Sequence, residues 1–120
     1  MENKLIKVGN ISGKLADYVS SGSGCDIFCS KGLKKHVQKR HPDCLKYMNI
    51  IPDIISAPDY IGRNPREEAN SIEMIKCLDN NVLIGIKLDI AGGYYYVATL
   101  HTITDAKLNN GLNSGRLTKY

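Results

Sequence analysis

The sequence predicts an α+β domain in which N-terminal helices pack on a four- to five-stranded antiparallel meander sheet. Between residues 31 and 57 the apolar residues recur at a helical period of about 3.6. From Ser71 onward the period changes to two, as in half-buried strands. The short polar segments 79–81 and 91–93 are typical of hairpin turns. Helices followed by a meander indicate the α+β class.

The chain of 120 residues is long enough to bury one core, so we expect a single domain. Residues 1–24 are expected to form an extended segment and a flexible connector, and residues 25–119 the core. No run of about 18 apolar residues is present, so no membrane helix is predicted. Residues 1–10 lack a hydrophobic signal core, so we expect action in the cytosol. A domain delivered as part of a larger exported toxin would also lack such a signal.

Two helical segments are expected after the connector. Ser30 is placed to cap a helix over residues 31–40, and Pro42 to end it. Leu33, His36 and Val37 share one face of that helix. The segment 43–56 is helical by its period, with Pro52 dividing it into two pieces or starting the second one. Residues 57–70 are predicted as a loop.

Three strands are expected after Ser71, in the segments "SIEMIKCL", "NVLIGIKLDI" and "YYYVATLHTI". In the middle strand Val82, Ile84 and Ile86 share an apolar face, and Lys87 lies on the opposite face. Alternation in the next strand groups residues 95, 97, 99 and 101 on one face, and we assign Thr99 and His101 to the polar face. The tail is predicted to hold a helical turn at 106–109, a loop, and a last strand at 116–120.

The four cysteines are Cys25, Cys29, Cys44 and Cys77, and they favour free or structural thiols. A zinc site would use Cys25, Cys29, His41 and Cys44. However, the segment "CDIFC" (25–29) is predicted to be a short strand, and residues four apart on a strand lie about 13 Å apart, too far for two ligands of one tetrahedral zinc. Nothing indicates the oxidising compartment that disulfides need. We therefore predict no metal site and no cofactor.

Basic side chains crowd the first helix although the net charge is only +4. Lys35, Lys39 and Arg40, followed by His41, suit a phosphate-bearing partner such as RNA. A solvated helix face is the alternative. At least one of the three consecutive tyrosines 94–96 must point away from the core, and Tyr95 is the candidate for stacking on a base. A ladder that only stabilises the sheet is equally compatible.

Metal-independent RNA cleavage needs a base, an acid, cations near the phosphate and groups that orient it. Imidazole serves as acid or base near neutral pH, and Lys and Arg supply charge. The candidate catalytic residues are His36, Lys87, Thr99, His101, Ser114 and Arg116. Each also has a plain structural reading, as a surface helix, strand or turn residue. No phosphate-binding glycine loop, HExxH or GxSxG motif is present.

An ordered series of segments resembles the phage-type nucleases of the barnase/EndoU/colicin/RelE superfamily. The segments are "GLKKHVQKRHPD", "IIPDIISAPDYIG", "SIEMIKCL", "VLIGIKLD", "YVATLHTIT" and the closing "SGRL". The resemblance covers about residues 26–119. It implies a small metal-independent ribonuclease with helices on an antiparallel sheet. It assigns His36 as acid or base, Lys87 and Arg116 to the phosphate, Thr99 and Ser114 as orienting hydroxyls, and His101 as a second acid or base.

The expected function is therefore an endoribonuclease, acting as a toxin on structured RNA such as tRNA. Attack by the 2′-hydroxyl would leave a 2′,3′-cyclic phosphate. An acidic immunity protein or antitoxin would be the partner that neutralises it, since complementary charge speeds capture. Two alternatives remain: a non-catalytic RNA-binding domain of the same fold, and an interaction domain of a phage or mobile-element protein.

Overall fold

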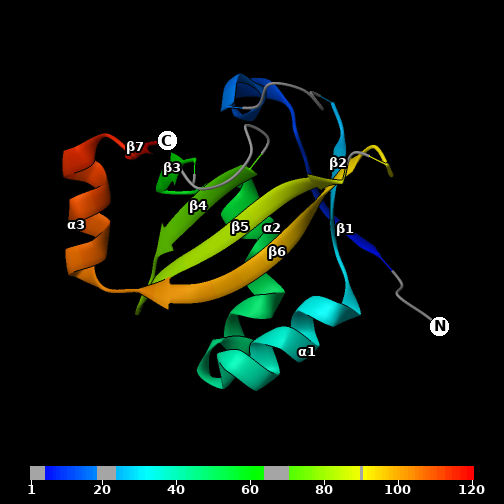
Figure 1. Ribbon diagram of the computed structural model, residues 1–120, viewed down its shortest axis with the longest axis horizontal. Helices are drawn as coiled ribbons and strands as arrows, with labels where there is room; N and C mark the ends of the chain where they lie inside the picture. Colours follow the sequence, from blue (N-terminus) through cyan, green and yellow to red (C-terminus); the bar gives the residue numbers. More distant parts are fainter. Residues whose placement is uncertain (1–4, 19–23, 64–70, 90) are drawn as a thin grey trace.

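The computed structural model describes residues 5–18, 24–63, 71–89 and 91–120 (Figure 1). Seven strands form one sheet in the order β1-β2-β6-β5-β4-β3-β7. The strands are β1 (Ile6–Asn10), β2 (Asp26–Cys29), β3 (Tyr60–Gly62), β4 (Ser71–Cys77), β5 (Asn81–Asp89), β6 (Tyr94–Ile103) and β7 (Leu117–Lys119). The α-helices are α1 (Lys31–Arg40), α2 (Ile51–Ser56) and α3 (Asp105–Ser114), and the 3₁₀ helices are η1 (Gly13–Tyr18) and η2 (Pro42–Ile50). No helix within these ranges is long and apolar enough to cross a membrane.

The α+β class holds, but the predicted architecture of N-terminal helices on a four- to five-stranded antiparallel sheet is wrong. The sheet has seven strands and is mixed, because β2 pairs in parallel with β6. Strands β1 and β2 precede α1, and α3 follows six of the seven strands. The strands predicted at 25–29 and 116–120 are present as β2 and β7, but β3, only three residues long, lies in a segment that was predicted as a loop. A strand as short as β3 shows too few alternations for a period of two to be recognised.

The three central strands and their hairpins are confirmed. β4, β5 and β6 are antiparallel neighbours. The loop predicted for 57–70 contains β3, and its residues 64–70 lie outside the described part of the chain. Most of the predicted connector, residues 20–23, lies outside it too. The helical turn predicted at 106–109 is a ten-residue helix, α3, capped by the Thr104 hydroxyl, which accepts from the Lys107 amide.

The helices α1, η2 and α2 cover one face of the sheet, where the main core lies (Figure 1). Ile72, Ile84 and Ile86 of the sheet are 0 % exposed and belong to the same core cluster as Val37 and Ile54 of the helices. α3 lies at the end of the sheet away from β1 and β2, where Leu108 joins a smaller apolar cluster. Truncating a core isoleucine to Ala typically lowers the free energy of unfolding by about 2–5 kcal/mol. The packing of this core therefore holds the sheet, and with it the polar face on its other side, in place.

A β-bulge in β6 decides which side chains reach that opposite face. Gly85 pairs with Thr99 and Ile86 pairs with Val97, so Ala98 is an extra residue in β6. Tyr95 and Val97 therefore lie on the core face, whereas Thr99 and His101 lie on the other face. The assignment of Thr99 and His101 to the face of Lys87 is confirmed. The strict alternation that grouped them with residues 95 and 97 is wrong, because the bulge shifts the period by one.

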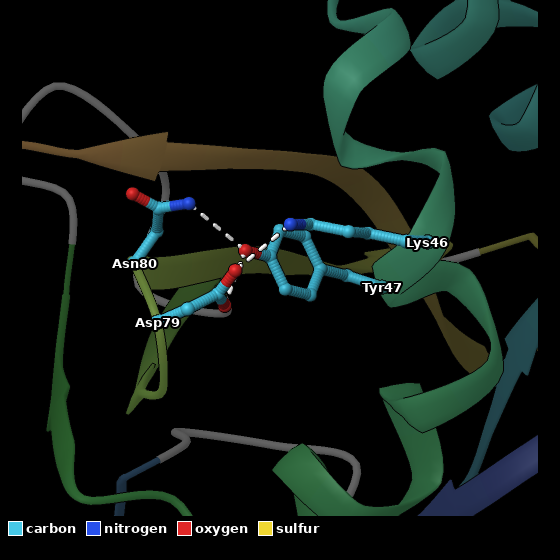
Figure 2. Close-up of polar contacts among 4 residues, drawn as sticks. All are labelled: Lys46, Tyr47, Asp79 and Asn80. Carbon is cyan, nitrogen blue, oxygen red and sulfur yellow. Dashed lines mark hydrogen bonds and ion pairs between the residues drawn. The ribbon is translucent and has the colours of Figure 1, made fainter.

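A polar cluster joins η2 to the turn between β4 and β5 (Figure 2). The Tyr47 hydroxyl donates to Asp79 Oδ1 at 2.7 Å, and Lys46 Nζ lies 2.8 Å from Asp79 Oδ2. Asn80 Nδ2 donates to the same Tyr47 hydroxyl at 3.0 Å. Lys46 and Tyr47 stabilise the ionised carboxylate, and the pKa of Asp79 falls from 3.8 to about 2.

We expect the Asp79 cluster to make stability depend on acid pH. The folded pKa lies below the unfolded one, so the cluster stabilises the fold fully above about pH 3.8. This contribution is lost as the pH falls from 3.8 to about 2. Urea unfolding of the wild type and Asp79→Asn should show a difference in midpoint at pH 6 that shrinks toward pH 2. An equal difference at both pH values would contradict this role.

Candidate active site

A cavity of about 630 Å³, here called the first cavity, opens between the polar face of the sheet and α3. Its polar lining residues are Glu73, His101, Lys107, Asn110, Ser114 and Arg116. Three of the six predicted catalytic residues, His101, Ser114 and Arg116, therefore meet in one place. His101 comes from β6, Ser114 from the last turn of α3 and Arg116 from the segment after it, and only the folded chain brings them together.

Glu73 is the acidic residue of this cavity, and the sequence analysis missed it. It lies in β4, and only 9 % of its surface is exposed. The Arg116 side chain donates a hydrogen bond to Glu73 and forms an ion pair with it. A signal was available, because Glu73 lies between Ile72 and Met74 in an otherwise apolar strand. Alternation would have placed it on the polar face.

Glycines flank Glu73 on both neighbouring strands. Gly62 of β3 pairs with Glu73 on one side, and Gly85 of β5 pairs with it on the other. Directly paired residues project to the same face of a sheet, so the carboxylate has no side chain beside it in either direction. A Cβ on Gly62 would overlap the Arg116 carbonyl oxygen, and one on Gly85 would lie 2.8 Å from Thr99 Cγ2. The glycines thus make room beside Glu73 for the Arg116 backbone and the Thr99 side chain.

The end of α3 presents Arg116 to the cavity. Gly115 ends the helix with φ of 81°, a left-handed conformation that favours glycine. The Ser114 hydroxyl donates to the Gly111 carbonyl at 3.1 Å and accepts from the Arg116 amide at 3.3 Å. Ser114 therefore shapes the turn that carries Arg116. If Ser114 also orients the phosphate, as predicted, its hydroxyl must do so while it makes these two hydrogen bonds.

His101 of β6 is half-buried in the same cavity. Its Nδ1 lies 3.1 Å from the Thr102 carbonyl oxygen. A carbonyl can only accept, so this contact is a hydrogen bond when Nδ1 carries the proton. Nε2 is then left to exchange a proton with a ligand. A buried carboxylate and an oriented imidazole thus line one cavity. These are the groups that general acid–base catalysis uses.

Lys87 and Thr99 lie on the same face, next to the first cavity but outside its lining. Thr99 is separated from Glu73 by Gly85 alone. Lys87 pairs with Ser71 on one side and with Tyr96 on the other, and it is half-buried. The face that carries the cavity therefore continues along β5 and β6 with a cation and a hydroxyl.

The three histidines of the chain lie in a row that leads from α1 to the first cavity. The ring centroids of His36 and His41 are 6.3 Å apart, and those of His41 and His101 are 5.5 Å apart. His36 is exposed on α1, and His41 caps the C-terminus of that helix. His36, the predicted principal acid or base, does not line the cavity of Glu73, whereas His101 does.

The predicted RNA-binding residues separate into two groups. Lys35, Lys39 and Arg40 are exposed on α1, on the approach to the histidine row. Tyr95 is enclosed in the core with 0 % of its surface exposed. This corrects the prediction that a base stacks on it. Of the three consecutive tyrosines, Tyr94 and Tyr96 remain half-exposed, on the polar face.

No group of three or more His, Cys, Asp or Glu side chains is arranged to hold a metal ion within the described ranges. The four cysteines are free. Burial raises the pKa of the Cys29 thiol, and burial together with the Asp43 charge raises that of Cys44. Both groups are therefore thiols at neutral pH.

Comparison with known proteins gives one match. The model of a family described as phage-Barnase-EndoU-ColicinE5/D-RelE like nucleases matches residues 6–110. No curated protein and no solved structure matches the chain. The matched range includes Glu73, Lys87 and His101, whereas Ser114 and Arg116 lie beyond its end.

Proposed function

The chain belongs to the phage-Barnase-EndoU-ColicinE5/D-RelE like nuclease family, and we propose that it is a metal-independent endoribonuclease. The observation that carries this proposal is the meeting of Glu73, His101 and Arg116 in the first cavity. A carboxylate, an imidazole and a guanidinium are the base, the acid and the phosphate ligand that RNA cleavage by its own 2′-hydroxyl requires.

In the proposed reaction, Glu73 takes the proton of the 2′-hydroxyl, and the 2′-oxygen forms a bond to phosphorus. The bond from phosphorus to the 5′-oxygen breaks, and His101, which starts the reaction protonated on both ring nitrogens, gives that oxygen its proton from Nε2. The products are a 2′,3′-cyclic phosphate and a 5′-hydroxyl. Neighbouring strands are about 4.8 Å apart, so β4 and β6 stand roughly 10 Å apart. His101 also lies two residues farther along β6 than Thr99, the residue in register with Glu73, so the two long side chains approach one phosphate from opposite sides and along the strands.

Arg116 and Lys107 supply positive charge to the phosphorane. Arg116 already pairs with Glu73, and its planar fork can also bind a phosphate oxygen. When the phosphate arrives, Arg116 has two anionic partners, and Glu73 is left freer to accept a proton. Lys87 and Thr99 hold the substrate farther along the same face.

The approach to this site is basic. Lys35, Lys39 and Arg40 on α1, together with His36 and His41, would attract the backbone of a structured RNA such as tRNA. Such a nuclease is toxic to the cell that makes it, so an acidic immunity protein or antitoxin should cover this surface. Growth arrest on induced expression, relieved by co-expression of such a partner, tests the toxin role. Normal growth with active enzyme present would refute it.

The first test is incubation of the purified protein with total bacterial RNA in excess EDTA. We expect discrete fragments on a denaturing gel, with 2′,3′-cyclic phosphate ends. Fragments that form only after a divalent metal is restored would contradict the mechanism. RNA that is bound but left intact would favour the non-catalytic RNA-binding domain. Neither binding nor cleavage by folded protein would favour the interaction domain.

A further inference from the structure

A second cavity, of about 490 Å³, lies on the other side of Arg116. It shares Ser114 and Arg116 with the first cavity, and its other polar or aromatic lining residues are Tyr18, Arg63 and Thr118. The two cavities are therefore adjacent, with Arg116 between them. The volume of the second cavity lies within the range of about 300–1,000 Å³ found for small-molecule sites.

Tyr18 is the aromatic residue of this cavity, and its ring packs against a second aromatic ring. Its ring stacks on the Tyr120 ring, with centroids 6.4 Å apart and planes inclined by 30°. Lys14 Nζ lies 4.6 Å from the centre of the Tyr120 ring and donates to the Tyr120 carbonyl at 2.6 Å. Tyr18 lines the cavity and Tyr120 does not. Tyr120 thus packs against one face of the Tyr18 ring from outside the cavity lining, and a ligand would use the other face.

Arg63 gives the second cavity a cation of its own. It follows β3, and its Nε donates to the Tyr18 carbonyl at 2.9 Å. This bond holds the guanidinium against the Tyr18 backbone and engages one of its five N–H groups. Arg116 stands on the other side of the cavity. No acidic side chain appears in the lining that the structure describes.

We propose that the second cavity binds the nucleotide next to the scissile phosphate, with its base on Tyr18 and its phosphate at Arg63. An aromatic ring beside guanidinium groups is how proteins hold single-stranded nucleic acid with little sequence preference. A strand crossing Arg116 would have one phosphate there and its next nucleotide in the second cavity. This inference rests on the proposed function and adds a site for RNA beyond the cleaved bond.

The test compares short RNAs that fill one cavity or both. Randomised pools of dinucleotides and tetranucleotides are cleaved, and kcat/KM is measured for each pool. We expect the wild type to favour tetranucleotides. Tyr18→Leu should lower the ratio of tetranucleotide to dinucleotide kcat/KM about ten-fold, the effect of one lost base stack. Tyr18→Phe, which keeps the ring, should restore it. An unchanged ratio in Tyr18→Leu would overturn the proposal.

Arg63→Gln should lower the same ratio, and Lys119→Gln is its matched control. Lys119 is exposed and lines neither cavity, so its loss removes the same charge without touching the site. Equal effects of the two variants would mean that only net charge matters, and would overturn the role of Arg63.

A binding measurement separates this proposal from the proposed function. If no RNA is cleaved, the affinity for a 2′-O-methyl tetranucleotide pool is measured instead. Binding about ten-fold weaker in Tyr18→Leu would uphold the second cavity while refuting the nuclease. Equal affinity of wild type and variant, or no binding by either, would overturn the second cavity as well.

Discussion

Glu73→Gln is expected to lower kcat/KM for RNA cleavage by a factor of about 10²–10⁴, the usual contribution of a general base. Gln has nearly the same shape and can still accept a hydrogen bond from Arg116, so the fold should be kept. What is lost is the proton acceptor beside the 2′-hydroxyl. The limb of the pH–rate profile that the base produces should disappear in the variant.

Two further variants complete this experiment: one removes the proposed acid, and the other is a control. His101→Ala should cause a loss of similar size and remove the opposite limb of the profile, because it takes away the acid. Asp53→Asn is the control, since Asp53 is an exposed carboxylate in the first turn of α2 and lines neither cavity. A stably folded Glu73→Gln protein that cleaves at the wild-type rate would exclude Glu73 as the base.

Gly62→Ala is expected to damage both stability and activity, although Gly62 carries no chemistry. Gly62 pairs with Glu73 on one side and with Leu117 on the other. A Cβ would overlap the Arg116 carbonyl oxygen and lie 2.9 Å from Leu117 Cδ2. Backbone must therefore shift, at a typical cost of about 1–3 kcal/mol. Displacement of Arg116 from Glu73 by about 1 Å should lower kcat/KM by about 10²-fold.

Urea unfolding and cleavage kinetics of the same preparation measure both effects. Gly32→Ala is the matched control, because Gly32 lies in α1 with no contact closer than 3.4 Å to an added Cβ. It should leave cleavage unchanged and stabilise the helix by up to about 1 kcal/mol. If Gly62→Ala cleaved RNA as the wild type does, the close fit of β3 against the Arg116 backbone would not matter for the site.

The family and the central hairpins were readable from the sequence because they rest on local patterns. β4, β5 and β6 are seven to ten residues long, which is enough for a period of two to be recognised even though a bulge interrupts it in β6. The helix over residues 31–40 is likewise bounded by Ser30 and Pro42. The resemblance to phage nucleases was carried by segments in a fixed order along the chain, so it did not depend on knowing how they pack.

Strand pairing corrected the assignment of individual side chains. Residues 95, 97, 99 and 101 alternate in the sequence, yet one bulge at Ala98 sends the first two into the core and the last two to the cavity. The same bulge explains why Tyr95 is buried. A bulge depends on the partner strand as well as on its own, so alternation within β6 could not reveal it.

The sequence by itself therefore determined the α+β class, the family and the central strands. It also determined which functional groups are present: imidazoles, cations and hydroxyls. Only the tertiary structure decided which of them meet. It placed Glu73 against Arg116 and between two glycines, brought His101 into the same cavity, and left His36 on the approach. The physical reason is that local periods specify which face a residue takes within its own strand or helix. A site depends instead on register between strands and on contacts such as that of Arg116 with Glu73, 43 positions apart along the chain.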